Sequence, residues 1–441
     1  MGTSQQAGVW AEQLRAKLKD KTAHVGVIGL GYVGLPLAVE FAKAGFQVTG
    51  IDVLQSKVDE LNSGSSYVQD VPSEVVSQLV KSGHLKATTN FEVISQFDTV
   101  NIAVPTPLRK TKDPDMSYVV SASQQVAKYA RPGLLVILES TTYPGTTAEL
   151  VLPMIEKEGL KVGEDFFLCF SPERVDPGNP KFQTNNIPKV VGGTTPTCTD
   201  LAVAFYSQAL ETVVPVSSTQ VAEMVKLLEN TFRMINIGLV NELAMMCDRM
   251  GINVWEVIEA AATKPFGFMP FYPGPGLGGH CIPIDPFYLS WKTKQAGIEA
   301  RFIDLAGYIN GQMPHFVVDK VISALNDHGK ALKGSKVHVA GAAYKRDIDD
   351  VRESPALDII HLLSKKGAHV TYSDPFVPKI QVEGHDMERT GILEAAESSD
   401  CVVIVTDHSG VDYAQLVGKA KLIVDSRNAL KGFKSEKIVR L

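Results

Sequence analysis

The stretch HVGVIGLGYVGLPLAVEFAKAG, residues 24–45, decides the fold. A short β-branched run leads directly into Gly29, Gly31 and Gly34, and a helical pattern follows at once. Gly29 permits a tight turn, Gly31 lets the backbone approach a pyrophosphate, and Gly34 allows the helix to pack closely on the strand. A glycine motif alone is weak evidence, but a strand before it and a helix after it are the context that dinucleotide binding requires.

The next strand-like run, QVTGID, ends in Asp52, about twenty residues beyond the glycines, where dinucleotide folds place an acid. A carboxylate there accepts hydrogen bonds from the ribose hydroxyls and repels a 2′-phosphate, so we expect NAD and not NADP. Tyr32 and Val33, inside the glycine motif, belong to the same expected NAD site. The alternative is a glycine-rich turn that binds no ligand.

Two later strand ends, VPTP at 104–107 and ESTTYPG at 139–145, carry hydroxyl side chains. Loops at the carboxyl ends of parallel strands line the ligand crevice, so we expect Thr106 and Thr141 to contact the nicotinamide or a reacting alcohol. The alternative is that these serines and threonines occur as turn residues.

Strand and helix signals also alternate along the rest of the chain, on both sides of one long helical segment. Alternating β-branched and helical runs in the first half predict βαβ units and a mostly parallel sheet. Residues 217–251 contain no proline and predict one long helix that ends at Gly251. Strand-like runs resume at KVHVAGAAY, HVTYSDP, CVVIVTDH and LIVDSRN. We therefore expect an α/β protein with two α/β domains joined by a long central helix, with a ligand between the domains. Residues 1–20 resemble an amphipathic helical extension.

Composition excludes several classes of protein. The 441 residues are 44% apolar and 21% charged, as in ordinary globular proteins. A formal charge of −6 without a basic block argues against nucleic acid as a partner. No apolar run predicts a membrane span or a signal core, so we expect no membrane partner and a cytoplasmic protein. The five cysteines are widely spaced and odd in number, which favours a reducing compartment.

Cys281 lies in PGPGLGGHCIPIDP, residues 273–286, a stretch too rich in glycine and proline for regular structure. Such a loop can hold a thiol against a ligand, with His280 and Asp285 as polar neighbours. We expect no metal here, because no second cluster of cysteine or histidine completes a zinc site. A thiol beside an NAD site can add to an aldehyde, and the resulting thiohemiacetal can be oxidised to a thioester that water hydrolyses. One thiol thus makes a second oxidation possible.

This chemistry needs a cation or a hydrogen-bond donor near the thiolate and the developing oxyanion. Lys226 and Asn230 lie four residues apart on one face of the expected long helix. The alternative for Lys226 is a solvated lysine that pairs with Glu223 or Glu229. A carboxylate that activates water is also needed, and Glu173, at a strand end, supplies one.

Eight motifs along the chain resemble the UDP-glucose/GDP-mannose dehydrogenase family: GLGYVGLP, VPTPL, ESTTYPGTT, SPERVDPGNP, AEMVKLLEN, PGPGLGGHCIPIDPFYL, YKRDIDDVRESPA and VDSRN. The resemblance covers nearly the whole chain and implies two Rossmann-like α/β domains with mostly parallel sheets, joined by a long central helix that also forms a homodimer. It also implies an NAD-binding domain at 1–212, a helical connector and dimerisation region at 213–312, and a UDP-sugar-binding α/β domain at 313–441.

The resemblance implies roles for the residues of matching motifs. It makes Cys281 the nucleophile, and Asp285 the residue that helps a water take protons from the 6-hydroxyl. It implies that Lys226 and Asn230 stabilise the oxyanion. Thr106 would position the catalytic water, and Glu173 would assist thioester hydrolysis. Further substrate contacts are implied for Arg174, Gly278, Lys345 and Arg427, and a contact with the NAD pyrophosphate for Arg352.

The motif around Cys281 also bears on the substrate. UDP-glucose dehydrogenases typically carry GGSC, whereas this chain has GGHC, and KPFGFMPFYPGPGLGGHC resembles the branch that acts on N-acetylated sugars. The implied reaction is the four-electron oxidation of the 6-hydroxymethyl of UDP-N-acetylglucosamine to UDP-N-acetylglucosaminuronate with two NAD+. UDP-N-acetylmannosamine and UDP-glucose are the alternative substrates.

Two other classes of function compete with this interpretation. An NAD-dependent sugar epimerase would use a Tyr-xxx-Lys pair such as Tyr288 and Lys292. This pair lies far from the glycine motif and next to the thiol segment, so coincidence explains it better. A non-catalytic scaffold would be expected to have lost the thiol or the lysine motif, and both are present.

Overall fold

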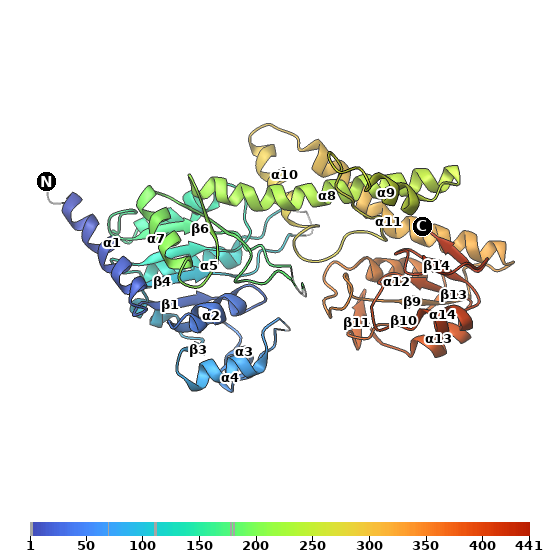
Figure 1. Cartoon of the computed structure of the whole chain (residues 1–441), viewed down its shortest axis with the longest axis horizontal. Helices are drawn as coiled ribbons and strands as arrows, with labels where there is room; N and C mark the ends of the chain where they lie inside the picture. Colours follow the sequence, from blue (N-terminus) through green and yellow to red (C-terminus); the bar gives the residue numbers. More distant parts are fainter. Residues whose placement is uncertain (1–2, 69, 110–112, 177–178, 180) are drawn as a thin grey trace. The chain divides into compact units, whose positions relative to one another are not determined.

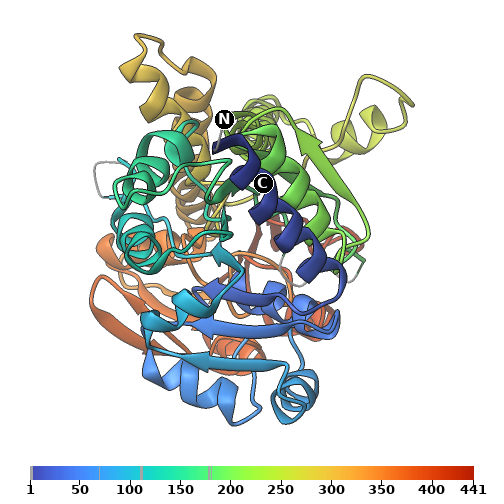
Figure 2. The ribbon, with the colours of Figure 1, turned by 90° about the vertical axis from the view of Figure 1, so that its left-hand side faces the viewer.

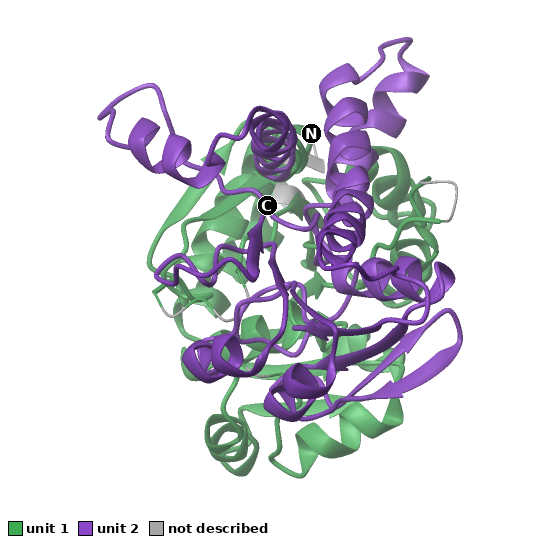
Figure 3. Ribbon diagram, turned by 90° about the vertical axis from the view of Figure 1, so that its right-hand side faces the viewer, with its two compact units in different colours: residues 1–229 green, residues 230–441 purple. Residues whose placement is uncertain are grey.

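The computed structural model describes residues 3–68, 70–109, 113–176, 179 and 181–441. The chain divides into two units, Met1–Glu229 and Asn230–Leu441 (Figure 3). The division falls inside the long helix α8 (Thr219–Met250). The prediction of one uninterrupted helix is confirmed, and Gly251 follows it with φ +69°.

Unit 1 contains an eight-stranded sheet in the order β3-β2-β1-β4-β5-β6-β7-β8 (Figure 1). Its strands are β1 (His24–Ile28), β2 (Gln47–Ile51), β3 (Leu85–Thr88), β4 (Thr99–Ile102), β5 (Leu135–Leu138), β6 (Phe167–Phe170), β7 (Lys189–Gly193) and β8 (Val213–Val216). Strands β6 and β7 run antiparallel, and the other described neighbours run parallel. The order of the first six strands is that of a dinucleotide-binding fold.

Helices cover both faces of this sheet (Figures 1 and 2). On one face α1 and α2 pack with α7 through Leu14, Leu37 and Phe205, and on the other α5 and α6 pack through Val126 and Ile155. The helices of unit 1 are α1 (Thr3–Lys19), α2 (Gly34–Lys43), α3 (Gln55–Asn62), α4 (Ser73–Lys81), η1 (Phe91–Gln96), α5 (Ser117–Tyr129), η2 (Thr147–Val151), α6 (Leu152–Glu156) and α7 (Pro196–Tyr206).

Helix α1 is the expected N-terminal extension. Its buried Leu14 and Leu18 belong to the core of unit 1, so the helix covers the sheet and is part of the fold. The first two residues of the predicted extension lie outside the described residues.

Unit 2 contains a five-stranded parallel sheet in the order β10-β9-β13-β14-β15 and a separate hairpin, β11-β12. The strands are β9 (Lys336–Ala340), β10 (His369–Ser373), β11 (Lys379–Val382), β12 (His385–Glu388), β13 (Cys401–Ile404), β14 (Ile423–Asp425) and β15 (Ile438–Arg440). Besides its part of α8, its helices are α9 (Val254–Ala261), α10 (Asp285–Gln295), α11 (Arg301–Asp327), α12 (Pro355–Lys365), α13 (Ile392–Ser398) and α14 (Tyr413–Lys419). The predicted α/β class with two mostly parallel sheets is confirmed.

The two expected domain boundaries, at residues 213 and 313, can be compared with the observed elements. Residue 213 begins β8, a strand of the unit 1 sheet, and residue 313 lies within α11. The division into three segments stays a prediction. In the part of the chain that the structure describes, every helix is too short or too polar to cross a membrane.

Candidate active site

The glycine turn of unit 1 has the geometry expected of a pyrophosphate-binding turn. Gly29 adopts φ +90°, and a Cβ there would lie 2.4 Å from the carbonyl oxygen of Ala103. A Cβ at Gly34 would lie 1.8 Å from the carbonyl oxygen of Gly29, so helix α2 can begin here only with glycine. A Cβ at Gly31 would meet no atom within 4 Å, which leaves the backbone of Gly31 open to a ligand.

Asp52 lies buried at the end of β2, beside the glycine turn. Its Oδ2 accepts a 3.0 Å hydrogen bond from the amide of Leu30, and its Oδ1 accepts one of 3.0 Å from the amide of Leu54. The Nζ of Lys57 lies 3.5 Å from Oδ2. An anchored carboxylate next to an open Gly31 fits the ribose and the pyrophosphate of NAD.

The two hydroxyl-bearing strand ends lie side by side. The hydroxyl of Ser140 donates to the carbonyl of Val104 over 2.7 Å, which ties the loop after β5 to the loop after β4. Thr106 is buried in one of these loops, and Thr141 is half-buried in the other. Thr142, directly after Thr141, has a buried hydroxyl without a hydrogen-bond partner among the described residues. These loops therefore hold more polar groups than turn formation alone uses.

Lys226, on α8, is 6% exposed and is not a solvated surface lysine. The two carboxylates that were its alternative partners are bound elsewhere. Glu223 is buried and accepts hydrogen bonds from the amide of Gly145 and from the amide and hydroxyl of Thr147. Glu229 forms a 2.6 Å ion pair with Arg174. The structure therefore favours the functional interpretation of Lys226.

Glu173 follows β6, and both of its carboxylate oxygens are bound. Oε1 accepts the amides of Arg174 and Val175, each over 2.7 Å, and Oε2 lies 3.2 Å from the Nζ of Lys189. Burial alone would raise the pKa of Glu173, but Lys189, the two amides and Lys226 outweigh burial and hold the pKa below its usual value. Glu173 is therefore an ionised carboxylate.

Sequence reasoning missed Lys189. It begins the apolar strand β7, yet its side chain is buried. A charged residue directly before a run such as VVGG was the available signal, but its partners lie on other strands and cannot be read from spacing.

In unit 2 the structure brings Asn230, Cys281 and Asp285 together. The side-chain amide of Asn230 donates to the carboxylate of Asp285, and both residues are buried. Arg233 in turn donates to the Oδ1 of Asn230. The carbonyl of Cys281 accepts the amide of Asp285 over 2.8 Å, at the turn that begins α10. Cys281 is partly exposed, whereas the other four cysteines are buried.

The thiol loop packs against the loop that follows β9. The amide of Gly279 donates to the carbonyl of Arg352 over 2.9 Å. A Cβ at Gly278 would lie 2.4 Å from the Cβ of Tyr344, so only glycine fits beside the residue that precedes Lys345. Gly278, Lys345 and Arg352, expected to bind ligands, therefore belong to two adjoining loops.

Arg427, after β14, joins the same group. Its Nε donates to the carbonyl of Val405 over 2.8 Å, and its Nη2 donates to the carbonyl of Tyr344 over 3.4 Å. A Cβ at Gly274 would lie 2.8 Å from Nη1. Burial lowers the pKa of the Arg427 guanidinium, and an arginine remains charged even so. The guanidinium is thus held rigidly beside the thiol loop of unit 2.

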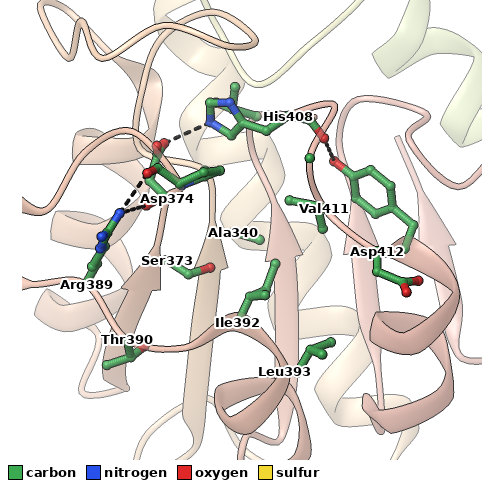
Figure 4. Close-up of a pocket in the computed structure, with 15 residues that line it drawn as sticks. Ala340, Ser373, Asp374, Arg389, Thr390, Ile392, Leu393, His408, Val411 and Asp412 are labelled. Atoms are coloured by element: carbon green, nitrogen blue, oxygen red, sulfur yellow. Dashed lines mark hydrogen bonds and ion pairs between the residues drawn. The ribbon is translucent and has the colours of Figure 1, made fainter.

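A pocket of about 370 Å³ lies at the carboxyl ends of β9, β10 and β13 (Figure 4). None of the predicted site residues lines it. Asp374 lies in the wall of this pocket. Its Oδ2 accepts hydrogen bonds from the amides of Ala342 and Ala343 and from the Nε2 of His408. Burial would raise the pKa of Asp374, but His408 and the amides hold it below its usual value. This carboxylate is therefore bound by donors of the chain itself.

Comparisons with known proteins agree along the chain. Three family models match: "UDP-glucose/GDP-mannose dehydrogenase family, NAD binding domain" at residues 23–210, the central domain at 220–312 and the UDP binding domain at 338–432.

Individual relatives carry two substrate names. UDP-N-acetyl-D-glucosamine 6-dehydrogenase of Pseudomonas aeruginosa is 35% identical, over 92% of this chain and 96% of the relative. UDP-N-acetyl-D-mannosamine dehydrogenase of Salmonella typhi is 36% identical, over 91% and 98%. Among solved structures, UDP-D-ManNAc dehydrogenase from Pyrococcus horikoshii matches with a TM-score of 0.87 and 33% identity, over 95% of this chain and 98% of that one.

Proposed function

Because the chain belongs to the UDP-glucose/GDP-mannose dehydrogenase family, we propose that it oxidises the 6-hydroxymethyl group of UDP-N-acetylglucosamine to the carboxylate of UDP-N-acetylglucosaminuronate. The protein is an oxidoreductase with NAD as its cofactor, and its C-terminal part is a UDP-binding domain. The proposed reaction removes four electrons, consumes two NAD+ and takes its second carboxylate oxygen from water. The observation that carries the proposal is the grouping of Cys281, Asn230 and Asp285 in unit 2.

For the cofactor we propose a site at the amino end of α2. Gly29, Gly31 and Gly34, with Tyr32 and Val33 between them, would bind the pyrophosphate, and Asp52 would bind the ribose. Thr106 and Thr141 would contact the nicotinamide, and Arg352 the pyrophosphate. When bound, NAD supplies the hydride acceptor for both oxidations.

Proton removal from the 6-hydroxyl is assigned to Asp285 acting through a water. Its carboxylate is held by the amide of Asn230, so its orientation is set before the substrate binds. Lys226 and Asn230 would donate to the oxygen that becomes negatively charged, and Thr106 would position the water. A fixed donor of this kind typically contributes about 3 kcal/mol to transition-state stabilisation.

Cys281 is assigned the covalent steps. Its thiolate would add to the aldehyde carbon, and oxidation of the resulting thiohemiacetal would leave a thioester. Water would then form a C–O bond to the thioester carbon while the C–S bond breaks and the thiolate leaves. Glu173 would accept one proton of that water.

For substrate binding we propose the remaining cations. Lys345 and Arg427 would bind the diphosphate of the UDP-sugar through their positive charges. Gly278 would allow the sugar to approach the thiol loop, and Arg174 would contact the sugar. We favour the gluco configuration, with UDP-N-acetylmannosamine and UDP-glucose as the competing substrates.

We also propose a homodimer formed through α8. Exposed apolar side chains recur along this helix at spacings that place them on one face. They are 37% to 62% exposed: Val221, Met224, Leu228, Phe232, Leu239, Leu243, Met246 and Met250. A continuous apolar face of this length is typical of a protein interface. We place the enzyme in the cytoplasm, where the catalytic thiol would stay reduced.

The direct test of the mechanism is Cys281→Ser, with Cys247→Ser as a control on a buried helical cysteine. We expect Cys281→Ser to bind NAD and the UDP-sugar normally and to release uronate more than about 1000-fold more slowly, because the covalent intermediate is lost. The control should keep its uronate production. Release of uronate by Cys281→Ser at the wild-type rate would refute the thiol mechanism.

The epimerase hypothesis is not supported. The family to which the chain belongs consists of dehydrogenases. Tyr288, which an epimerase would use as an acid, is fully buried in α10. An epimerase would also accumulate no net NADH.

A further inference from the structure

Unit 1 contains a row of three charged groups that the proposed reaction uses at one end only. Lys189, at the start of β7, lies with its Nζ 2.5 Å from the Oε2 of Glu139 and 3.2 Å from the Oε2 of Glu173. Glu139 follows β5 and is completely buried, whereas the side chain of Glu173 is 13% exposed. The row therefore leads from the interior of the sheet to the carboxylate assigned to thioester hydrolysis.

The buried end of the row is fixed by further hydrogen bonds. The Oε1 of Glu139 accepts the side-chain amide of Asn101 over 2.7 Å and the hydroxyl of Tyr206 over 2.6 Å. Its Oε2 is thereby aimed at Lys189. Burial alone would lower the pKa of Lys189, but Glu139 and Glu173 outweigh burial and raise it, so the ammonium stays charged.

A buried ion pair is by itself weak evidence for stabilisation, because apolar side chains of similar volume often serve as well. The hydrogen bond from Lys189 to Glu173 has a further consequence, because it also orients the Glu173 carboxylate. The Oε1 of Glu173 is already held by two backbone amides, so the bond from Lys189 to Oε2 fixes the remaining oxygen. The carboxylate is therefore held in one orientation by donors to both of its oxygens, while its side chain stays 13% exposed.

We propose that Lys189 is a positioning residue for thioester hydrolysis: it holds Glu173 ionised and in one orientation, and Glu139 holds Lys189 in place. The inference rests on the proposed function of Glu173. An ionised Glu173 can accept a proton from the attacking water, whereas a protonated one cannot. Lys189 would thereby set the lowest pH at which the thioester is hydrolysed.

The charged and titratable groups around Glu173 come from several elements. Lys189 faces it from β7 and Lys226 from α8, and Glu139, after β5, binds Lys189. Tyr206, on α7, bonds to Glu139. On the loop of Glu173 itself, the Arg174 guanidinium is bound to Glu229 and to the carbonyl of Pro188. Among the described residues, Lys189 is the cation that contacts the carboxylate directly, so its removal should change the titration of Glu173 most.

The test compares Lys189→Arg with the double variant Lys189→Gln/Glu139→Gln. The double variant removes the two buried charges together, so no buried charge is left without its partner. We expect the acid limb of the kcat profile of the double variant to move up by about one pH unit or more, because an opposite charge at this distance lowers a carboxyl pKa by that amount. Intact-protein mass spectrometry should show the acyl-enzyme accumulating below the new limb.

Two controls separate positioning from folding. Lys189→Arg should restore the wild-type acid limb, because it restores the cation. Lys17→Gln removes another cation of unit 1, one that pairs with Asp98 over 2.8 Å, and should leave the acid limb unchanged. Circular dichroism and NAD binding must match wild type in the double variant, and if they do not, Lys189→Met/Glu139→Leu replaces it as the charge-free variant.

A second readout distinguishes failure of this inference from failure of the proposed function. In the NAD-bound protein, the infrared band of the Glu173 carboxyl group is identified from the difference spectrum between wild type and Glu173→Gln. The pH dependence of this band is then measured in proteins with and without Lys189. An upward shift without Lys189 supports the inference even if Glu173→Gln accumulates no acyl-enzyme, which would overturn only the role of Glu173. A folded double variant whose infrared titration and acid limb both coincide with wild type would overturn the inference.

Discussion

The two α/β units begin with the same turn and use it differently. Gly29 follows β1 with φ +90°, and Gly341 follows β9 with φ +92°. Each amide donates a 2.8 Å hydrogen bond to the carbonyl of the last residue of the neighbouring strand, Gly29 to Ile51 and Gly341 to Ser373. Both units also place an aspartate directly after that strand. The opening of a dinucleotide fold is therefore present twice in this chain.

The residues after the turn distinguish the two units. Unit 1 reads GLGYVG, and α2 begins at Gly34, five residues after Gly29. Unit 2 reads GAAYKR at the aligned positions, and α12 begins only at Pro355. Its longer loop carries Lys345 and Arg352. The second and third glycines, which allow a helix to start at the turn, are thus retained where the NAD-binding domain lies and lost in the UDP-binding domain.

The two aspartates differ in the same way. Asp52 holds one amide of the glycine turn, that of Leu30. Asp374 holds two, and it is also bound by His408 and by the amides of Phe376 and Val377. Asp52 also accepts the amide of Leu54 and lies 3.5 Å from the Nζ of Lys57, so it has fewer donors than Asp374. A carboxylate with fewer donors retains more capacity for ribose hydroxyls, whereas one with five donors serves the fold. The two units therefore differ in how many donors their aspartate binds, and not in whether the aspartate is present.

The largest expected effect is that of Gly34→Ala. Its Cβ would lie 1.8 Å from the backbone oxygen of Gly29, so α2 must move away from β1. We expect a loss of more than about 3 kcal/mol in unfolding free energy and no measurable NAD binding. Arg346→Ala, at the aligned position of unit 2, should leave NAD binding intact. Thermal unfolding and NAD titration of both variants check this, and normal NAD binding by Gly34→Ala would contradict it.

A pH effect of similar size is expected in unit 2. His338 occupies the strand position that is Gly26 in unit 1, and burial lowers its pKa to about 4. The histidine is neutral when folded and takes up a proton when unfolded, so stability is complete above about pH 6.5 and falls as the pH drops toward 4. The loss should reach about 3 kcal/mol.

The check is the pH dependence of denaturant unfolding in wild type and in His338→Gln. The variant should lose this part of the pH dependence, because the titrating ring is gone while a polar group remains for Thr371 and Ser373. Parallel pH profiles of the two proteins between pH 4 and 6.5 would show that His338 does not titrate on unfolding.

Replacing each of the two aspartates by asparagine should affect the two units differently. Asp374→Asn should lower stability by about 2 kcal/mol, because buried amides and His408 lose a charged acceptor, while NAD affinity stays the same. Asp52→Asn should weaken NAD binding about tenfold and lower stability less than Asp374→Asn does, because Asp52 has fewer donors. Equal effects of the two substitutions on NAD binding would remove the distinction between the two units.

The smallest effect on stability is expected for Gly31→Ala. A Cβ at this position meets no atom within 4 Å, so the unfolding free energy should change by less than about 0.5 kcal/mol. NAD affinity should still fall about tenfold, because the methyl group would stand where the pyrophosphate approaches. Calorimetric titration with NAD checks this, and an unchanged affinity would mean that the pyrophosphate lies elsewhere.

Local patterns predicted the elements that carry strong signals. The run before Gly29, the helix from 219 to 250 and the irregular loop around Cys281 follow from periodicity, glycine and proline. Strands β3, β7, β8 and β15 and the hairpin β11-β12 were not expected. KVVGG carries two glycines, VVPV a proline and HDME mostly polar residues, and each weakens a strand signal that tertiary pairing restores.

The candidate site shows the same division between features that local sequence predicts and features that depend on tertiary contacts. Spacing placed Lys226 and Asn230 on one helix face, and the resemblance assigned the motif residues. Spacing did not decide whether Lys226 is buried, because that depends on Glu223 and Glu229 finding partners on other elements. The contact between Lys189 and Glu139 joins residues from separate strands, and such pairs are set by sheet order and not by local sequence.

The most direct test of the central claim is the amount of NADH formed from a limiting, weighed quantity of UDP-N-acetylglucosamine with excess NAD+. The reaction is followed to completion beside UDP-N-acetylmannosamine and UDP-glucose. The proposed thioester mechanism predicts two NADH per UDP-N-acetylglucosamine and much slower reaction of the other two sugars. One NADH per sugar would contradict the thioester step, and a faster complete reaction of another sugar would contradict the proposed substrate.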